Sequence, residues 1–364
     1  MKNLRCLLSI LALSVAVQSM AQKGVGNQFL EDLKQNTKVG GYVIARYNYN
    51  DRAGQSKNGG FDFQYVRAYA ESRVLDDFYF KVQMQINGAP AASGENRPRL
   101  LDAFIEWQKY KFARIKIGQF DRAFSMEVPF NPWVIGFHDN AQVINMLGGM
   151  TDRVGEHYSN GRDLGLQVQG DFLPVGKDGH ELIHYQVGVF NGQGINHSDN
   201  NKQKDLMGVL QFKPLKELAI GVTGWAGDYT ANGITVDRNR WGVGIDYESD
   251  WVFRTEYISS QGHKISDYDT TTGQLKSDAG GDGADGWYVA LGVPVADKFR
   301  IYSRWDVYRD QKESDTQKTQ YGLTAEYYFM KNLKAQLNYF FTEDKSVSVG
   351  RYYNTIDFQV YFRF

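Results

Sequence analysis

The sequence is poor in cysteine, in long apolar segments and in excess charge. Its single cysteine, Cys6, lies near the N-terminus, ahead of a short apolar run. Apart from that run, no stretch approaches the roughly 20 apolar residues that a membrane-spanning helix needs. The formal net charge is −1, which gives no reason to expect a nucleic-acid partner. These shortages argue against a disulfide scaffold, a helical membrane bundle and a basic nucleic-acid-binding protein.

Residues 1–21 have the form of a signal peptide. Lys2 and Arg5 precede the apolar run 7–17, and small residues follow at the two positions that a signal peptidase reads. We therefore expect cleavage before Gln22 and export of the mature chain. The cysteine would be removed with this segment, which leaves the mature chain without disulfides or thiol chemistry.

Aromatic rings, by contrast, are abundant. Tyr, Phe and Trp make up 14% of the residues, yet the mean hydropathy is −0.48, so an apolar, ring-rich face must coexist with a wet one. Apolar and polar residues alternate in FYFKVQMQI (78–86). The same period of two recurs in LGLQVQGDF (164–172), WYVALGV (287–293) and LKAQLNYFF (333–341).

Such runs predict sixteen strands, an even number. They span residues 40–50, 61–74, 78–87, 100–107, 113–120, 162–172, 181–190, 205–213, 217–227, 238–248, 251–260, 286–293, 298–309, 319–329, 332–343 and 351–364. Short turns alternate with longer Gly-, Asn-, Asp- and Ser-rich stretches between them, a pattern typical of up-and-down barrels in bacterial outer membranes. We therefore predict an all-β, antiparallel transmembrane barrel over residues 39–364, with a periplasmic segment at 22–38.

The chain ends on IDFQVYFRF (356–364), which alternates up to a terminal phenylalanine. A last strand that closes against the first must be complete at its end. This form is also the one that outer-membrane assembly machinery is expected to recognise. The alternative is a soluble all-β protein whose apolar face is its core, but that alternative explains neither this ending nor the sorted loops.

Three segments resemble parts of the phosphate-selective porin O and P family. They are KIGQFDRAFSME (116–127), GRDLGLQVQGDF (161–172) and YQVGVFNGQG (185–194). The resemblance implies a trimeric outer-membrane channel for phosphate or other small anions, narrowed by a loop folded into its lumen. Family members with true phosphate selectivity place several arginines and lysines at the constriction. Residues 123–152 of this sequence contain neither, which puts phosphate binding in doubt.

The stretch 121–161 is too long and too apolar for an idle surface connection. We expect it to fold into the lumen, while a subunit contact or a surface lid remains an alternative. Its candidate constriction residues are Phe124, Glu127, Trp133, His138 and Arg153.

Basic residues on the polar parity are candidates for the pore lining and for anion steering. They are Arg46, Arg67, Arg114, Lys116, Arg122, Arg254, Arg300 and Arg304. The densest group precedes the long stretch and would either attract anions or pair with Asp102 and Glu106 on the neighbouring strand.

The predicted function is passive diffusion of small hydrophilic solutes, with anions such as phosphate as the expected class. The predicted partners are these solutes, outer-membrane lipid and two further copies of the chain in a homotrimer, with no nucleic acid. We predict no catalytic residues, cofactor or metal site. The rival hypotheses are a lipase- or protease-type barrel enzyme and a structural or adhesive barrel.

Overall fold

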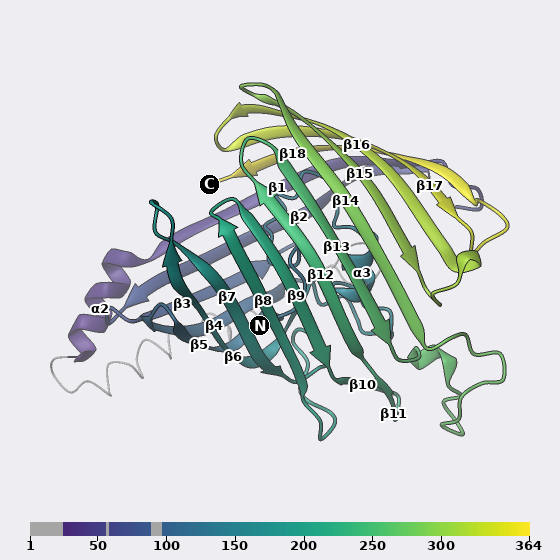
Figure 1. The fold of residues 1–364 in the computed structure, drawn as a ribbon, viewed down its shortest axis with the longest axis horizontal. Helices are drawn as coiled ribbons and strands as arrows, with labels where there is room; N and C mark the ends of the chain where they lie inside the picture. The colour runs from purple at the N-terminus through teal and green to yellow at the C-terminus, as the bar shows by residue number, and fades with distance from the viewer. Residues whose placement is uncertain (1–24, 56–57, 89–96) are drawn as a thin grey trace, which may run out of the picture.

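A computed structural model describes residues 25–55, 58–88 and 97–364, so the predicted signal peptide lies outside the described residues. Sixteen of the strands in this part of the chain form one closed antiparallel barrel (Figure 1). They are β1 (Lys38–Asn50), β2 (Gly59–Val74), β3 (Phe78–Gln85), β4 (Arg99–Tyr110), β5 (Ala113–Asp121), β6 (Arg162–Val175), β7 (His180–Phe190), β8 (Asp205–Leu215), β9 (Leu218–Ala226), β12 (Asn239–Glu248), β13 (Val252–Gln261), β14 (Gly283–Ala296), β15 (Phe299–Arg309), β16 (Gln317–Met330), β17 (Leu333–Asp344) and β18 (Tyr352–Arg363). The predicted all-β, sixteen-strand antiparallel barrel is confirmed.

The first and last strands close the barrel. β1 pairs with β18 in an antiparallel register that places Tyr42 opposite Arg363. The terminal residue takes part in this closure, because Gly41 N donates to Phe364 O at 3.1 Å and Phe364 N donates to Gly41 O at 3.0 Å. Closure satisfies the backbone groups that an open edge would leave unpaired in a membrane.

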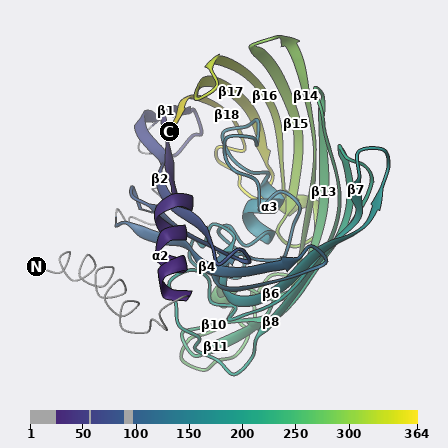
Figure 2. The ribbon, with the colours of Figure 1, turned by 90° about the vertical axis from the view of Figure 1, so that its left-hand side faces the viewer.

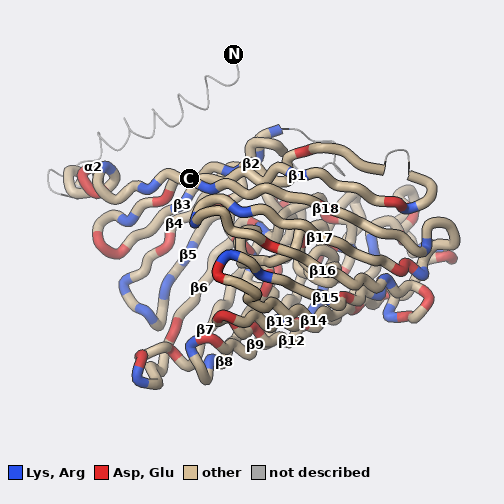
Figure 3. Tube along the Cα trace, turned by 90° about the horizontal axis from the view of Figure 1, so that it is seen from above, with Lys and Arg blue, Asp and Glu red and all other residues tan. Residues whose placement is uncertain are grey.

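The period of two separates an outer from an inner surface. On β18, Ile356 and Phe358 point outward and are exposed, whereas Asp357 and Gln359 point into the lumen and are fully buried. Along the trace of the strands most residues carry no charge, and many charged residues lie toward the ends of the barrel (Figure 3). An apolar outer wall with a polar lumen is the arrangement of a transmembrane barrel.

The two ends of the barrel differ. Both β1 and β18 have their chain ends at the rim that carries the short turns, which we call the short-turn end; the opposite rim is the long-loop end (Figure 1). The helix α2 (Val25–Asn36) lies at the short-turn end, where Asp32 accepts a 2.7 Å hydrogen bond from Leu75 N and Phe29 packs on Phe80. No helix among the described residues has the length and apolar character to span a bilayer.

Sequence patterning missed five short elements in the loops and one helix in the N-terminal segment. The loop helix is α3 (Gln142–Leu147), and the single-turn 3-10 helices are η2 (Ile265–Asp267) and η3 (Ser314–Thr316). A hairpin of β10 (Asp228–Ala231) and β11 (Ile234–Asp237) extends the long-loop end. Its turn residues, Asn232 and Gly233, both have positive φ (54° and 76°), which is the turn that an Asn-Gly pair favours.

Candidate functional site

The segment 122–161, which joins β5 to β6, lies inside the barrel (Figure 2). Its helix α3 packs against the wall formed by β13, β14 and β15. Phe124, Ile144 and Leu147 are almost fully buried in one apolar cluster that includes Trp225 of the wall. Burial of apolar surface stabilises by about 25 cal/mol per Å². The apolar composition of the segment is therefore accounted for by its contact with the wall.

Wall carboxylates hold the backbone of this segment. Glu256 on β13 accepts hydrogen bonds from Ser125 Oγ at 3.0 Å and from Met126 N at 3.2 Å. Asp306 on β15 accepts one from Gln142 N at 2.8 Å, at the first turn of α3. Buried N–H groups need such partners. The segment is thus fixed at its beginning and at its middle.

Wall cations hold its carbonyl groups. Arg254 donates to Val134 O at 3.0 Å, Arg304 to Asp139 O at 2.9 Å, and Lys334 to Trp133 O at 2.6 Å. These three donors lie on β13, β15 and β17. The segment is therefore drawn toward one side of the lumen, and these charges are used to position it.

The returning end of the segment is fixed by a buried cluster of three arginines, Arg122, Arg238 and Arg240, which we call the arginine cluster. Their guanidinium carbons lie 5.0, 4.4 and 4.7 Å from the ring centroid of Trp225. All three side chains are completely buried. Like charges at this spacing repel, so the cluster requires carboxylate partners.

Those partners come from the segment and from the wall. Asp152 accepts from Arg240 NH2 at 2.6 Å and from Arg240 NH1 at 2.9 Å. Glu156 accepts from Arg122 at 2.8 Å and also from Arg238, which donates to Asp205 of the wall at 2.7 Å. Although burial alone raises the pKa of the Asp152 carboxyl, Arg240 and Arg238 bring that pKa down to about 2. The carboxylate is therefore charged at any physiological pH.

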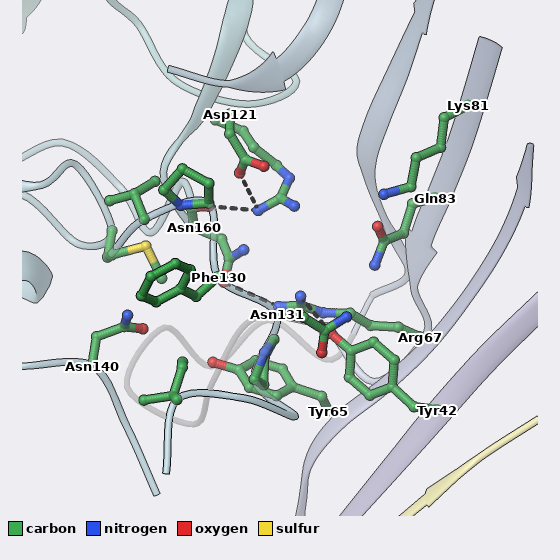
Figure 4. A pocket seen from close by; sticks show the side chains of 16 residues that line it. Tyr42, Tyr65, Arg67, Lys81, Gln83, Asp121, Phe130, Asn131, Asn140 and Asn160 are labelled. Atoms are coloured by element: carbon green, nitrogen blue, oxygen red, sulfur yellow. Dashed lines mark hydrogen bonds and ion pairs between the residues drawn. The ribbon is translucent and has the colours of Figure 1, made fainter. Parts of the chain in front are cut away.

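A cavity of about 90 Å³ remains between the segment and the opposite wall, β1 to β6 (Figure 4). Its lining combines three cations with aromatic and amide side chains. The lining residues are Tyr42, Tyr65, Arg67, Lys81, Gln83, Asp121, Val128, Pro129, Phe130, Asn131, Pro132, Ile135, Asn140, Met150, Asn160 and Arg162. We call this space the constriction cavity.

Arg67 is held in place by neutral groups. It donates from NH1 to Tyr42 OH at 2.7 Å, from NH2 to Asn160 Oδ1 at 3.1 Å and from Nε to Gln85 Oε1 at 3.1 Å. Its guanidinium carbon lies 4.2 Å from the ring centroid of Tyr65. Among the described residues, no carboxylate lies within ion-pair distance of this buried side chain.

The other two cations of the constriction cavity are neutralised. Lys81 Nζ lies 3.1 Å from Asp102 Oδ2, and Arg162 Nε lies 2.6 Å from Asp102 Oδ1. Arg162 NH1 is also 3.0 Å from Asp121 Oδ1. Two carboxylates thus balance two cations, and the charge of Arg67 is left in excess.

Within the described part of the chain, no three His, Cys, Asp or Glu side chains meet in a way that would hold a metal ion. His180 and His184 do not share a partner: His180 contacts Asp178, and His184 contacts Asp171.

The model of the phosphate-selective porin O and P family matches residues 38–250, more than half of the 364 residues. The chain belongs to this family. It is therefore a porin, a channel-forming barrel of the outer membrane. No curated protein sequence matches the chain significantly.

Solved structures of other barrels share the fold of this porin. The anion-selective porin from Comamonas acidovorans is 13% identical, with a TM-score of 0.65 over 90% of this chain and 99% of that chain. The outer membrane channel DcaP of Acinetobacter baumannii is 12% identical, with a TM-score of 0.65 over 90% and 97%. OmpT of Vibrio cholerae, in its trimer form, is 12% identical, with a TM-score of 0.59 over 90% and 99%.

The predicted basic residues of the porin occupy different environments. Arg46 pairs with Asp62 at 2.5 Å, and Arg114 pairs with Asp171 at 2.6 Å. Lys116 has no ion pair within the described chain; it lies over the rings of Phe104 and Phe120 and opposite Glu106 in the sheet register. Arg300 faces Glu326 across the β15–β16 register. Of the eight predicted basic residues, only Arg67 lines the constriction cavity.

The predicted loop residues are all anchored. Phe124 packs edge-on against Trp225, and Glu127 accepts from Asn140 at 2.9 Å. Trp133 packs against Tyr361, and Arg153 pairs with Asp310 at 3.2 Å. His138 lies over Phe340, and burial lowers its pKa to about 4, so its ring is neutral at pH 7.

Sequence reasoning did not single out several residues that shape the site. Lys81 was available on the polar parity of the run 78–86, and Arg162 stands at the start of GRDLGLQVQGDF. Arg238 and Arg240 share one parity at the entry to a predicted strand, which was a signal for two inward-pointing arginines. The tyrosines of the constriction cavity carried no comparable signal.

Proposed function

We propose that this porin is a passive diffusion channel that favours small anions and has no catalytic activity. The observation that carries the proposal is the charge of the constriction cavity, where Arg67 has no carboxylate partner among the described residues. An uncompensated cation in a narrow space with low-dielectric walls raises the local concentration of anions. The description of the Comamonas acidovorans porin as anion-selective is in keeping with this proposal.

The proposal includes the assembly and placement of the chain. Residues 1–21 direct export, residues 22–38 lie on the periplasmic side, and the barrel stands in the outer membrane. The segment 121–161 forms the constriction of the pore. Three copies form a homotrimer, as in the trimer form of the Vibrio cholerae protein. Cross-linking in native outer membranes tests the oligomer, and a product no larger than one chain contradicts the trimer.

Planar-bilayer recording of the purified porin tests the proposed conduction. We expect discrete conductance steps and, under a KCl gradient, a reversal potential displaced toward that of chloride, because the cavity carries one excess positive charge. A reversal potential displaced toward potassium contradicts anion preference and leaves the channel intact. A folded sample without any conductance steps contradicts the channel itself.

The enzyme hypothesis makes a separate prediction. A lipase- or protease-type barrel hydrolyses phospholipid micelles or peptide substrates, and we expect no turnover of either by this porin. Measured hydrolysis that copurifies with the folded barrel contradicts the proposal of a non-catalytic channel.

A further inference from the structure

Arg67 keeps hydrogen-bond donors that no described residue uses. A guanidinium group has five N–H donors. Three are used, by Tyr42, Asn160 and Gln85, and each of the three bonds leaves from a different nitrogen. One N–H therefore remains on each terminal nitrogen. Donors on two neighbouring nitrogens suit the two oxygens of a carboxylate.

Neighbouring groups add uncharged donors to this fork. The Tyr42 hydroxyl accepts from Arg67, which leaves its own hydrogen available to donate. Asn160 accepts through Oδ1 from both Arg67 and Tyr158, and its amide nitrogen stays available. Gln83 and Asn131 lie at the same cavity (Figure 4). Hydroxyl and amide groups of this kind suit a ligand with hydroxyl groups beside its charge.

The net charge of the constriction cavity determines which ligand charge it favours. Lys81 and Arg162 are neutralised by Asp102 and Asp121, so the cavity offers one net positive charge. A single negative charge matches it. A second negative charge on the same ligand would find no further unpaired cation among the lining residues and would face the carboxylate of Asp121. Like charges in a confined site cost free energy.

We propose that Arg67, with Tyr42 and Asn160, binds the carboxylate of small hydroxylated organic acids, and that the pore favours such monocarboxylates over phosphate. The proposal rests on the proposed channel function and names its solute class. Aromatic contact supports it, since the guanidinium carbon lies 4.2 Å from the ring centroid of Tyr65, a cation–π contact that helps to fix the position of the guanidinium at the cavity.

Competition with chloride current tests the proposal, with glycolate and inorganic phosphate as probes at pH 8, where phosphate carries mostly two charges. We expect glycolate to halve the single-channel chloride current at a concentration about tenfold lower than phosphate does. In Arg67→Gln, the half-blocking concentration of glycolate should rise about tenfold, which is the effect of losing roughly 1.4 kcal/mol. Phosphate that blocks at an equal or lower concentration than glycolate overturns the proposal.

Two further variants distinguish the effect of the paired donors of Arg67 from the effect of its charge and from a failure to fold. Arg67→Lys keeps the charge without the paired donors, so glycolate block should weaken nearly as much as in Arg67→Gln. Tyr42→Phe keeps the ring and removes one donor, and we expect a rise of about threefold in the half-blocking concentration, in line with a weaker neutral hydrogen bond. Unchanged glycolate block in Arg67→Lys and Tyr42→Phe overturns the proposal even if Arg67→Gln fails to fold.

The matched control is Arg351→Gln, which removes an arginine of a partly exposed ion pair with Glu343 at the long-loop end. Glycolate block in this variant should stay within twofold of the unaltered porin. An anion-conducting porin that glycolate does not block refutes the solute class alone. A porin without conductance refutes both this proposal and the proposed function.

Discussion

Asp152→Ala is expected to release the segment 122–161 from its place in the lumen. The carboxylate accepts two hydrogen bonds from Arg240 and lies 3.4 Å from Arg238, and all three side chains are fully buried. Breaking a buried ion pair by removing one partner costs about 3–5 kcal/mol, because the remaining charge is left uncompensated. The returning end of the segment, which Asp152 holds, should therefore open more readily than the rest of the barrel.

Two measurements check this result. Chemical denaturation of the refolded barrel in lipid should show an unfolding free energy lower by about 3–5 kcal/mol. Single-channel recording should show a larger and noisier current, since the freed segment no longer fills its side of the lumen. Glu343→Ala is the control, because its ion pair with Arg351 is partly exposed and such pairs contribute about 0–1 kcal/mol.

The pH dependence of the same carboxylate sharpens the test. The pKa of Asp152 in the folded chain is about 2, below the value of about 3.9 for an unperturbed aspartate. A depressed pKa stabilises the folded state above the unfolded pKa, and this contribution disappears as the pH falls through the folded value. The difference in unfolding free energy between the unaltered porin and Asp152→Ala should therefore stay constant from neutral pH down to about pH 4 and shrink below it. A difference that already shrinks between about pH 7 and pH 5, or an Asp152→Ala variant of unchanged stability, contradicts this role for Asp152.

The strands of the barrel wall could be predicted from the sequence because the alternation of apolar and polar residues depends only on residues close together in the chain. Each strand must alternate, and the alternation of Ile356 and Phe358 with Asp357 and Gln359 is legible without any knowledge of the neighbouring strand. The short turns were legible for the same reason. The Asn232-Gly233 turn of the β10–β11 hairpin was also present as a local signal, but its strands of four residues are too short for periodicity to reveal.

The interior could not be predicted in the same way, because its contacts join residues far apart in the chain. Glu156 meets Arg238, and Trp133 meets Lys334, only because the barrel brings distant strands around one lumen. Parity shows that Arg67 points inward, but it does not show that Asp102 and Asp121 are taken by other cations. Which basic residue lacks a carboxylate partner depends on how the carboxylates pair with the other cations. This pairing can be seen only in the folded barrel.

Leu323→Arg tests the premise that lipid covers the outer wall. Leu323 is the seventh of the fourteen residues of β16, points outward and is 54% exposed. If hydrocarbon surrounds it, an arginine there destabilises the barrel by about 2–4 kcal/mol, the cost of a charge near the middle of the membrane. If water surrounded it, the same substitution on an exposed position would change stability by less than about 0.5 kcal/mol.

Val349→Arg provides the matched comparison, because Val349 is 68% exposed but lies between β17 and β18, beyond the strands at the long-loop end. We expect this variant to unfold at the same denaturant concentration as the unaltered porin, while Leu323→Arg unfolds earlier when both are refolded into lipid vesicles. Both side chains are exposed on the outside of the barrel, and the two positions differ in their depth in the expected membrane. Equal tolerance of arginine at both positions would mean that water, and not lipid, covers the outer surface of the barrel. That result would contradict the transmembrane channel on which the proposed solutes depend.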